Sequence, residues 1–181
     1  MTLALVLGGA RSGKSRLAED LVLRATGPVT LIATAEAGDE EMRLRIMAHQ
    51  QSRAADWSVI EEPTDLLNAL AATNPADAVI VDCLTLWASN LIGEGLGDAE
   101  IEGLAVATAK EAAGRPRMTV AVSNEVGSGI VPVNALARRY RDLLGRVNAI
   151  WADSSEEVYL TVAGGVVPVQ RLGSLWGNGD G

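Results

Sequence analysis

Residues 8–15 read Gly-Gly-Ala-Arg-Ser-Gly-Lys-Ser, and this stretch matches the pattern G-x-x-x-x-G-K-[ST] at every position. Its glycines let the backbone curl so that successive N–H groups point inward at phosphate oxygens. Lys14 can reach the β- and γ-phosphates of a nucleoside triphosphate, and the Ser15 hydroxyl is a suitable ligand for Mg²⁺. We therefore predict a phosphate-binding loop (P-loop) that handles ATP or GTP.

The segments on either side of this loop support the prediction. The short apolar run Leu3–Leu7 is typical of a buried strand, and Ser15–Ala25 has apolar residues at helical spacing. A helix that starts near Ser15 directs its positive end at the bound phosphates. A chance match in a glycine-rich chain is the alternative, but it predicts neither the strand before the loop nor the helix after it.

Runs of apolar residues alternate with helical patterns along the rest of the chain. Strands are expected at 29–33, 57–60, 78–81, 118–123, 158–163 and 166–169. Helices are expected at 39–53, from an N-cap at Thr64 to Ala72, and at 84–92, 98–113 and 134–152. Gly164-Gly165 is a two-residue hairpin signal between the last two strands.

This alternation predicts an α/β fold of the P-loop NTPase (RecA-like) type. It should have three layers, with a mainly parallel sheet between helices and an antiparallel hairpin at the C-terminus. Residues 1–172 are expected to form one domain, and residues 173–181 a flexible tail.

Composition limits the classes of function. The 181 residues are 48% hydrophobic and 21% charged, with a net charge of −8 that disfavours nucleic-acid binding. No apolar run reaches the roughly 20 residues that a membrane span needs, and no signal peptide is recognisable. The lone Cys83 rules out an internal disulfide. We therefore expect a cytoplasmic protein without a membrane span.

Asp82 ends a hydrophobic strand, which is the usual position of the acidic partner of a P-loop. In that role it would serve Mg²⁺ together with Ser15. The alternative is a capping residue for the helix that begins near Leu84, and both roles could coexist.

The single histidine lies on an arginine-rich helical face. Arg45, His49 and Arg53 are spaced four residues apart and so share one side of the helix expected over 39–53. Cationic neighbours disfavour protonation of His49, and neutral imidazole is a nucleophile toward phosphorus. Flanking guanidinium groups can hold the phosphate under attack. The pattern suits a covalent phosphoramidate, although a solvated helix face with an idle histidine fits it as well.

Seven stretches in order give the chain a specific resemblance from Leu3 to about Val169. They are GGARSGKS (Gly8–Ser15), IAT (Ile32–Thr34), DEEMRLRIMAHQQSR (Asp39–Arg53), the spaced pair Trp57 and Glu61, VDCLTLW (Val81–Trp87), SNEVGSGIVP (Ser123–Pro132) and ARRYRDLLGRVN (Ala137–Asn148). The chain resembles the bifunctional adenosylcobinamide kinase/adenosylcobinamide-phosphate guanylyltransferases of cobalamin biosynthesis.

The resemblance implies two reactions and a homo-oligomer, with a trimer expected. A nucleoside triphosphate, ATP or GTP, phosphorylates the adenosylcobinamide hydroxyl. GTP then guanylylates the phosphate product through a GMP–histidine intermediate, giving adenosylcobinamide-GDP and pyrophosphate. The resemblance assigns the nucleophile to His49, with Lys14 as the other catalytic residue.

The resemblance also implies nucleotide contacts in several segments of the chain. They are Gly8, Gly9, Ala10, Arg11, Ser12, Gly13, Lys14, Ser15, Ile32, Ala33, Thr34, Gln50, Gln51, Ser52, Arg53, Glu61 and Asp82. A carboxylate can accept hydrogen bonds from guanine, so one of Glu61 and Asp82 is expected to read the base while the other serves the metal. Some family members carry Glu where this chain has Asp82.

Two competing functions have distinct signatures. A plain P-loop small-molecule kinase would leave His49 as a bystander. A GTPase switch or motor is disfavoured because the chain has no N-K-x-D guanine motif.

Asn124–Gly127 is expected on the cobinamide side or as a glycine turn. Arg138, Arg139 and Arg141 are candidates for substrate phosphate, or for a solvated or inter-subunit helix face.

Overall fold

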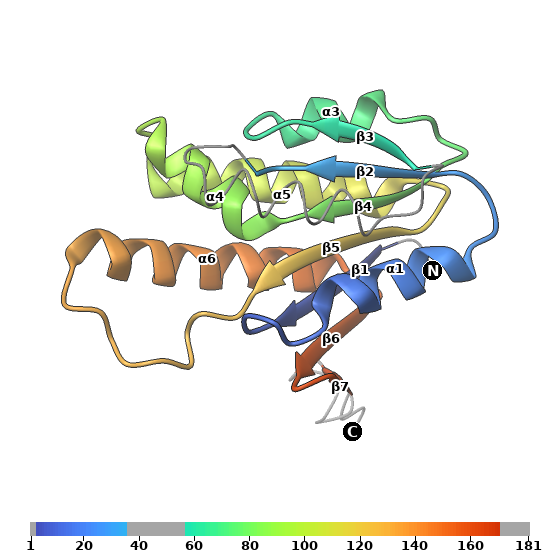
Figure 1. Ribbon diagram of the computed structural model, residues 1–181. Helices are drawn as coiled ribbons and strands as arrows, with labels where there is room; N and C mark the ends of the chain where they lie inside the picture. Colours follow the sequence, from blue (N-terminus) through green and yellow to red (C-terminus); the bar gives the residue numbers. More distant parts are fainter. Residues whose placement is uncertain (1–2, 36–56, 171–181) are drawn as a thin grey trace, which may run out of the picture.

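The computed structural model describes residues 3–35 and 57–170, and its strands form one mostly parallel sheet in the order β3-β2-β4-β5-β1-β6-β7 (Figure 1). The strands are β1 (Leu3–Gly8), β2 (Val29–Ala33), β3 (Ser58–Glu61), β4 (Ala78–Asp82), β5 (Thr119–Asn124), β6 (Glu157–Val162) and β7 (Gly165–Pro168). Among these described strands, only β7 pairs in the antiparallel direction, with β6.

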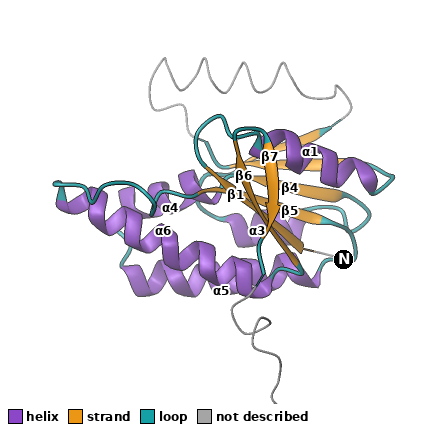
Figure 2. Ribbon diagram, turned by 90° about the horizontal axis from the view of Figure 1, so that it is seen from below, coloured by secondary structure: helices purple, strands orange, loops and turns teal. Residues whose placement is uncertain are grey.

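Helices cover both faces of this sheet. They are α1 (Lys14–Arg24), α3 (Leu66–Ala72), α4 (Leu84–Gly93), α5 (Asp98–Gly114) and α6 (Ala135–Ser154). Figure 2 shows α1 on one side of the strands and α4, α5 and α6 on the other. The predicted three-layer α/β fold is confirmed. β5 separates the strand before the P-loop from the strand that ends at Asp82, as in the RecA-like arrangement predicted.

The core has two parts because side chains alternate across each buried strand. Leu3 and Leu5 of β1 pack in the cluster that contains α3 to α6, whereas Ala4 and Val6 pack toward α1. Trp87 of α4 and Trp151 of α6 are both fully buried in the larger cluster. The strands read as continuous apolar runs because both faces are covered.

Two local predictions are wrong by one residue. The hairpin turn is Ala163–Gly164, with φ of 49° and 80°, and Val162 pairs with Gly165. Both central residues of such a two-residue turn need positive φ, and here they are Ala163 and Gly164. A turn at Gly164–Gly165 would remove Gly165 from its pairing with Val162. The N-cap of α3 is Asp65, not Thr64, since the Asp65 carboxylate accepts from the Asn68 amide.

Two predicted segments cannot be compared with the structure. The helix expected over 39–53 and the tail expected over 173–181 lie outside the described residues. Within residues 3–35 and 57–170, no helix is long and apolar enough to cross a membrane.

Candidate active site

Six strands run parallel, so their carboxyl ends meet at one edge of the sheet, where open α/β sheets bind ligands. β1 leads into the P-loop there. Asp82 ends β4, and Ala33 of β2 pairs with it in register. Asn124 ends β5 opposite Gly8, and the Glu125 amide donates to the Gly8 carbonyl at 3.1 Å. The candidate residues of four separate sequence segments therefore share this edge.

Several residues of the P-loop have positive φ angles. Gly13 precedes α1 with φ of 105°, a left-handed value that glycine adopts without strain. The helix begins at Lys14, so its first N–H groups face the loop. Arg11 also has a positive φ, of 54°. These conformations fit a loop that presents its amides to an anion.

Lys14 is half-buried inside its own loop. Its Nζ donates to the Gly9 carbonyl at 2.6 Å. Burial lowers the pKa of Lys14, while the Cys83 and Asp82 groups nearby oppose that shift. The ammonium is therefore held close to Asp82 and costs the ligand-free protein some desolvation energy, which a bound triphosphate would offset.

Ser15 and Asp82 line the same small hollow, with Trp57 and Glu19 beside them. This places a hydroxyl and a carboxylate together, the oxygen donors that Mg²⁺ prefers. The N-cap of α4 is Cys83, one residue after Asp82, and the Cys83 side chain makes no capping hydrogen bond. Burial raises the pKa of Cys83 to about 11, and the Asp82 charge adds to that shift.

Residues 32–34, predicted to contact nucleotide, lie at the end of β2 and make hydrogen bonds with neighbouring segments. Ile32 and Thr34 are fully buried. The Thr34 hydroxyl bonds to both peptide groups of Cys83, and Asn90 donates to the Thr34 carbonyl at 2.9 Å. Ala33 is only half-buried. Nucleotide contact by these residues stays a prediction, whereas their role in fixing the end of β4 is visible.

Glu61 lies apart from the P-loop. It ends the edge strand β3, in register with Ala33 of β2 and thus two strands from Asp82. Strands are spaced about 4.8 Å apart, so the Cα atoms of Glu61 and Asp82 are roughly 10 Å apart. The two side chains therefore start from separate strands, and of the two only Asp82 lines the hollow that contains Ser15.

The predicted nucleophile and its neighbours lie outside the described residues. These are His49, Gln50, Gln51, Ser52 and Arg53. Their roles stay predictions.

One site residue carries no sequence signal. Thr161 of β6 is 2% exposed, and its hydroxyl lies 2.7 Å from that of Ser12 in the P-loop. The two residues are far apart in the chain, and a threonine in a strand is ordinary. Only the pairing of β1 with β6, which sets Gly8 opposite Thr161, brings them together.

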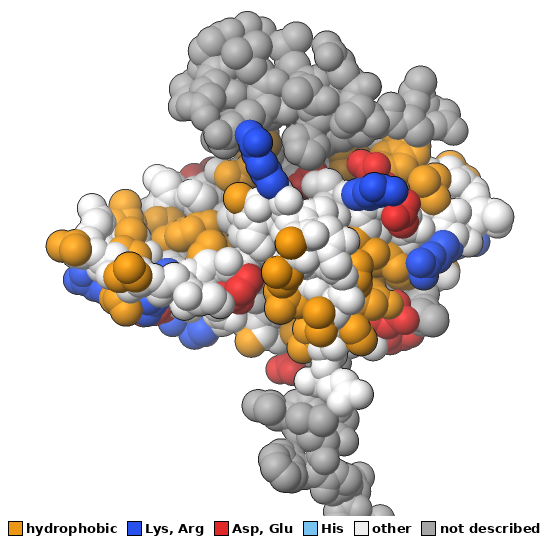
Figure 3. All heavy atoms as spheres, turned by 60° about the horizontal axis from the view of Figure 1, so that its bottom comes forward, with side chains coloured by type: hydrophobic (Ala, Val, Ile, Leu, Met, Phe, Trp, Pro, Cys, Tyr) orange, Lys and Arg blue, Asp and Glu red, His pale blue; other side chains and the backbone are white. Residues whose placement is uncertain are grey.

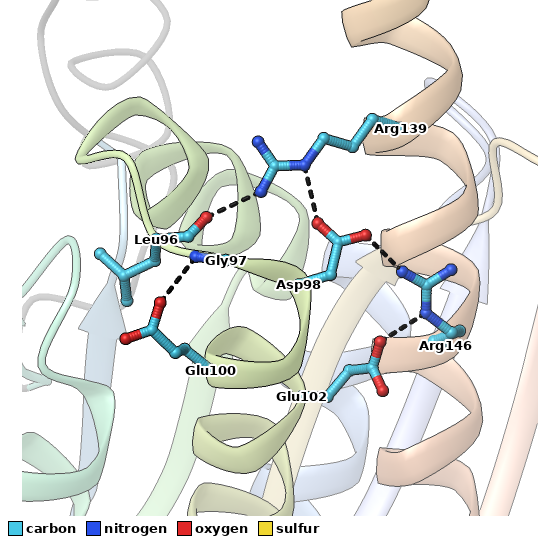
Figure 4. A network of polar contacts seen from close by, with 7 residues as sticks. All are labelled: Leu96, Gly97, Asp98, Glu100, Glu102, Arg139 and Arg146. Atoms are coloured by element: carbon cyan, nitrogen blue, oxygen red, sulfur yellow. Dashed lines mark hydrogen bonds and ion pairs between the residues drawn. The ribbon is translucent and has the colours of Figure 1, made fainter.

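The three arginines considered for substrate phosphate, Arg138, Arg139 and Arg141, all make other contacts. Arg139 donates to Asp98 at 2.7 Å and to the Leu96 carbonyl, while Arg146 bridges Asp98 and Glu102 (Figure 4). This network joins α6 to the start of α5. Arg138 donates to carbonyls of the preceding loop, and Arg141 pairs with Asp142. The helix-face interpretation is therefore favoured.

Comparisons with known proteins agree over most of the chain. A family model described as cobinamide kinase / cobinamide phosphate guanyltransferase matches residues 4–169. The bifunctional adenosylcobalamin biosynthesis protein CobP of Pseudomonas aeruginosa is 44% identical over 173 residues, which cover 92% of this chain and 96% of that protein. The bifunctional protein CobU of Escherichia coli is 40% identical over 177 residues, covering 88% and 95%.

A third relative and one solved structure complete the comparison. CobU of Salmonella typhimurium is 40% identical over 173 residues, covering 88% of this chain and 95% of that protein. The crystal structure of the RadB recombinase is similar with a TM-score of 0.49 and 16% identity, covering 88% of this chain and 73% of that one.

Proposed function

The chain belongs to the cobinamide kinase / cobinamide phosphate guanyltransferase family, and we infer its function from that membership. It is a bifunctional transferase of cobalamin biosynthesis. It phosphorylates the adenosylcobinamide hydroxyl with a nucleoside triphosphate and transfers GMP from GTP to the resulting phosphate. The observation that carries this conclusion is 40–44% identity to relatives named for both activities, over nearly their whole length.

The P-loop is assigned to the triphosphate of the kinase step. Backbone N–H groups of Gly8 to Ser15 would hold phosphate oxygens, and Lys14 would exchange the Gly9 carbonyl for the β- and γ-phosphates. These positive groups stabilise the charge on the transferring phosphoryl group. Mg²⁺ fits the Ser15 hydroxyl and the Asp82 carboxylate, which line one hollow, and when bound it supplies charge neutralisation at the phosphates.

The guanylyl step is assigned to His49. Its neutral imidazole nitrogen would attack the α-phosphorus of GTP, forming a P–N bond as the bond to the β-phosphate oxygen breaks and pyrophosphate leaves. A phosphate oxygen of adenosylcobinamide phosphate then attacks the same phosphorus and displaces His49. This assignment rests on the family motif and on the arginines that flank His49 in the sequence.

The different positions of Asp82 and Glu61 support different roles for the two residues. Asp82 shares its hollow with Ser15, whereas Glu61 is two strands away at the end of β3. We therefore assign the metal to Asp82 and recognition of guanine N1–H and its amino group to Glu61.

Labelling tests the covalent step. Protein incubated with GTP labelled at the α-phosphate should retain label that is stable to alkali and released by acid. His49→Gln should take up none, while Lys110→Gln, which changes a residue of α5, serves as the matched control. If His49→Gln still phosphorylates adenosylcobinamide and neither protein is ever labelled, the chain is a plain small-molecule kinase.

Exposed apolar side chains support the expected homo-oligomer. Ile130 and Val133, in the loop before α6, are each 97% exposed, and Val166 and Val167 of β7 are about half exposed. Figure 3 shows separate groups of hydrophobic side chains on the face that it draws. Patches of this kind mark protein interfaces. Light scattering should give a trimer for the wild type and a smaller species for the double variant Ile130→Asp, Val133→Asp.

A further inference from the structure

The β6–β7 hairpin contacts the P-loop through a chain of buried hydroxyl groups. The Thr161 hydroxyl donates to the Leu7 carbonyl at 3.1 Å and lies 2.7 Å from the Ser12 hydroxyl. A hydroxyl has one proton to donate, so the Ser12 hydroxyl must donate to Thr161. Both side chains are buried, at 5% exposure for Ser12 and 2% for Thr161. The bonds are therefore shielded from competing water.

The hairpin turn holds the same P-loop residue a second time. The Gly164 amide donates to the Ser12 carbonyl at 3.0 Å. The positive φ angles of Ala163 and Gly164 point that amide at the loop. The turn also lies close to Gly13, because a Cβ placed on Gly13 would be 3.7 Å from the Gly164 Cα. Ser12 is thus anchored by its side chain and by its backbone.

An anchored loop matters because a phosphate site works through several amides that must point inward together. A glycine-rich segment that is free to move loses backbone entropy at each residue when it is ordered on a ligand. Contacts made before binding remove part of that cost and so raise affinity. The P-loop residues on the solvent side, Gly9 to Arg11, are exposed. Ser12 is the point at which the loop is tied to the sheet.

We propose that Thr161, with the Ala163–Gly164 turn, is a positioning element of the nucleotide site that holds the P-loop ready for the triphosphate. The proposal rests on the phosphate-binding role of the P-loop given above. It does not depend on guanylyl transfer.

Three threonine variants separate positioning from general stability. Thr161→Val keeps the shape and removes the hydroxyl, and Thr161→Ser keeps the hydroxyl. Thr30→Val is the matched control, since the Thr30 hydroxyl is also buried and donates to Asp77 at 2.7 Å, but at the opposite edge of the sheet. Each protein is titrated with MgATP by calorimetry, and its unfolding is followed in urea.

Thr161→Val should raise the dissociation constant for ATP roughly tenfold, the equivalent of one buried hydrogen bond, and Thr161→Ser should stay within about twofold. Thr30→Val should lose stability but bind ATP as the wild type does. In the kinase assay, Thr161→Val should raise KM for the triphosphate and leave KM for adenosylcobinamide unchanged.

Equal ATP affinity of Thr161→Val and wild type would overturn the proposal and leave Thr161 a purely structural residue. If Thr161→Val does not fold, Ser12→Ala is the variant to measure. It removes the hydroxyl that donates to Thr161 and leaves the bond from Thr161 to the Leu7 carbonyl in place. An ATP affinity of Ser12→Ala equal to that of the wild type would also overturn the proposal. A wild-type protein that binds no triphosphate is a different result, which overturns the P-loop function and the positioning role together.

Discussion

The Thr34 hydroxyl lies between the two peptide groups of Cys83, accepting from its N–H at 2.8 Å and donating to its carbonyl at 2.7 Å. The Thr34 amide also donates to the Asp82 carbonyl at 3.0 Å. One buried side chain at the end of β2 thus fixes the backbone on which the proposed metal carboxylate sits.

Replacing Thr34 with valine should therefore be costly. The change leaves an N–H and a carbonyl of Cys83 without their partner in a site where Thr34 is fully buried. Each lost partner costs about 1–3 kcal/mol of unfolding free energy. Urea denaturation of Thr34→Val should show a loss of about 2–6 kcal/mol for the two partners together, and Thr34→Ser should recover most of it. A valine variant as stable as the wild type would mean that water replaces the hydroxyl.

The fold was largely predictable because its signals are local. Apolar runs that alternate with helical patterns located the strands and helices of the described chain, and the P-loop motif predicts where phosphate binds. The motif predicts a role for Lys14, and the end of a hydrophobic strand predicts one for Asp82.

The contacts that support the site were not predictable, because they depend on strand order. The Thr161 hydroxyl contacts the Ser12 hydroxyl because β6 lies beside β1. Asn90 donates to the Thr34 carbonyl because α4 packs close to the end of β2. Neither residue has an unusual neighbourhood in the sequence. The hairpin turn was misplaced by one residue because Gly164 and Gly165 are equally permissive, and the positive φ of Ala163 has no signal in a single sequence.

Gly8 is the glycine of the P-loop that the surrounding structure requires most strictly. A Cβ at Gly8 would lie 2.3 Å from the Thr161 hydroxyl oxygen and 2.6 Å from its backbone carbonyl. Gly8→Ala should therefore lose about 1–3 kcal/mol of unfolding free energy through overpacking, and its ATP affinity should fall. Thermal denaturation and ATP titration check both effects.

Gly103→Ala is the matched control for that change. Gly103 lies on the exposed side of α5 with nothing within 4 Å of its added Cβ. Alanine should stabilise that helix by up to about 1 kcal/mol and leave ATP binding unchanged. Equal behaviour of the two variants would contradict the close approach of Thr161 to Gly8.

Cys83 should be a poor nucleophile despite its place beside the site. Burial, with the Asp82 charge, raises its pKa to about 11. At pH 8 only about one thiol in a thousand is then ionised, and the thiolate is the reactive form. Iodoacetamide should label the folded protein slowly, with a rate that rises as the pH approaches 11, and label the urea-unfolded chain at the ordinary rate. Asp82→Asn should lower the pKa and speed labelling.

Asp98 is expected to stabilise the contact between α5 and α6 in a pH-dependent way. The hydrogen bond from Arg139 is the main reason that the pKa of Asp98 is lowered from 3.8. A lowered carboxylate pKa adds stability that is present above pH 3.8 and is lost as pH falls through the value in the folded protein. Asp98→Asn should lose at most about 1 kcal/mol at neutral pH, because the network is solvent-accessible.

The deficit of Asp98→Asn should shrink in 1 M salt and disappear at low pH, as followed by urea denaturation. Asp142→Asn, which removes only the contact between neighbouring residues Arg141 and Asp142, should change stability less. Activity of both variants should match the wild type. A loss of substrate phosphate binding in Arg139→Gln without a loss of stability would instead revive the phosphate role of that arginine.

Lys14 should lower the stability of the protein without ligand and strengthen the binding of a triphosphate. Burial lowers its pKa from 10.5, so the folded protein disfavours the charged form. The cost is full below the lowered pKa and vanishes as pH rises through that value toward 10.5. Ligand-free Lys14→Met should therefore be at least as stable as the wild type at pH 7. Its advantage should decline with rising pH.

Saturating MgATP should reverse that order. A charge-assisted bond to phosphate contributes about 1.5–3 kcal/mol, so Lys14→Met should bind ATP at least roughly tenfold more weakly. Ligand then raises the melting temperature of the wild type much more than that of the variant. Melting curves at pH 7 and pH 9, each with and without MgATP, measure both effects. A variant that is less stable without ligand and equally stabilised by ATP would show that Lys14 serves the loop through its Gly9 bond rather than the nucleotide.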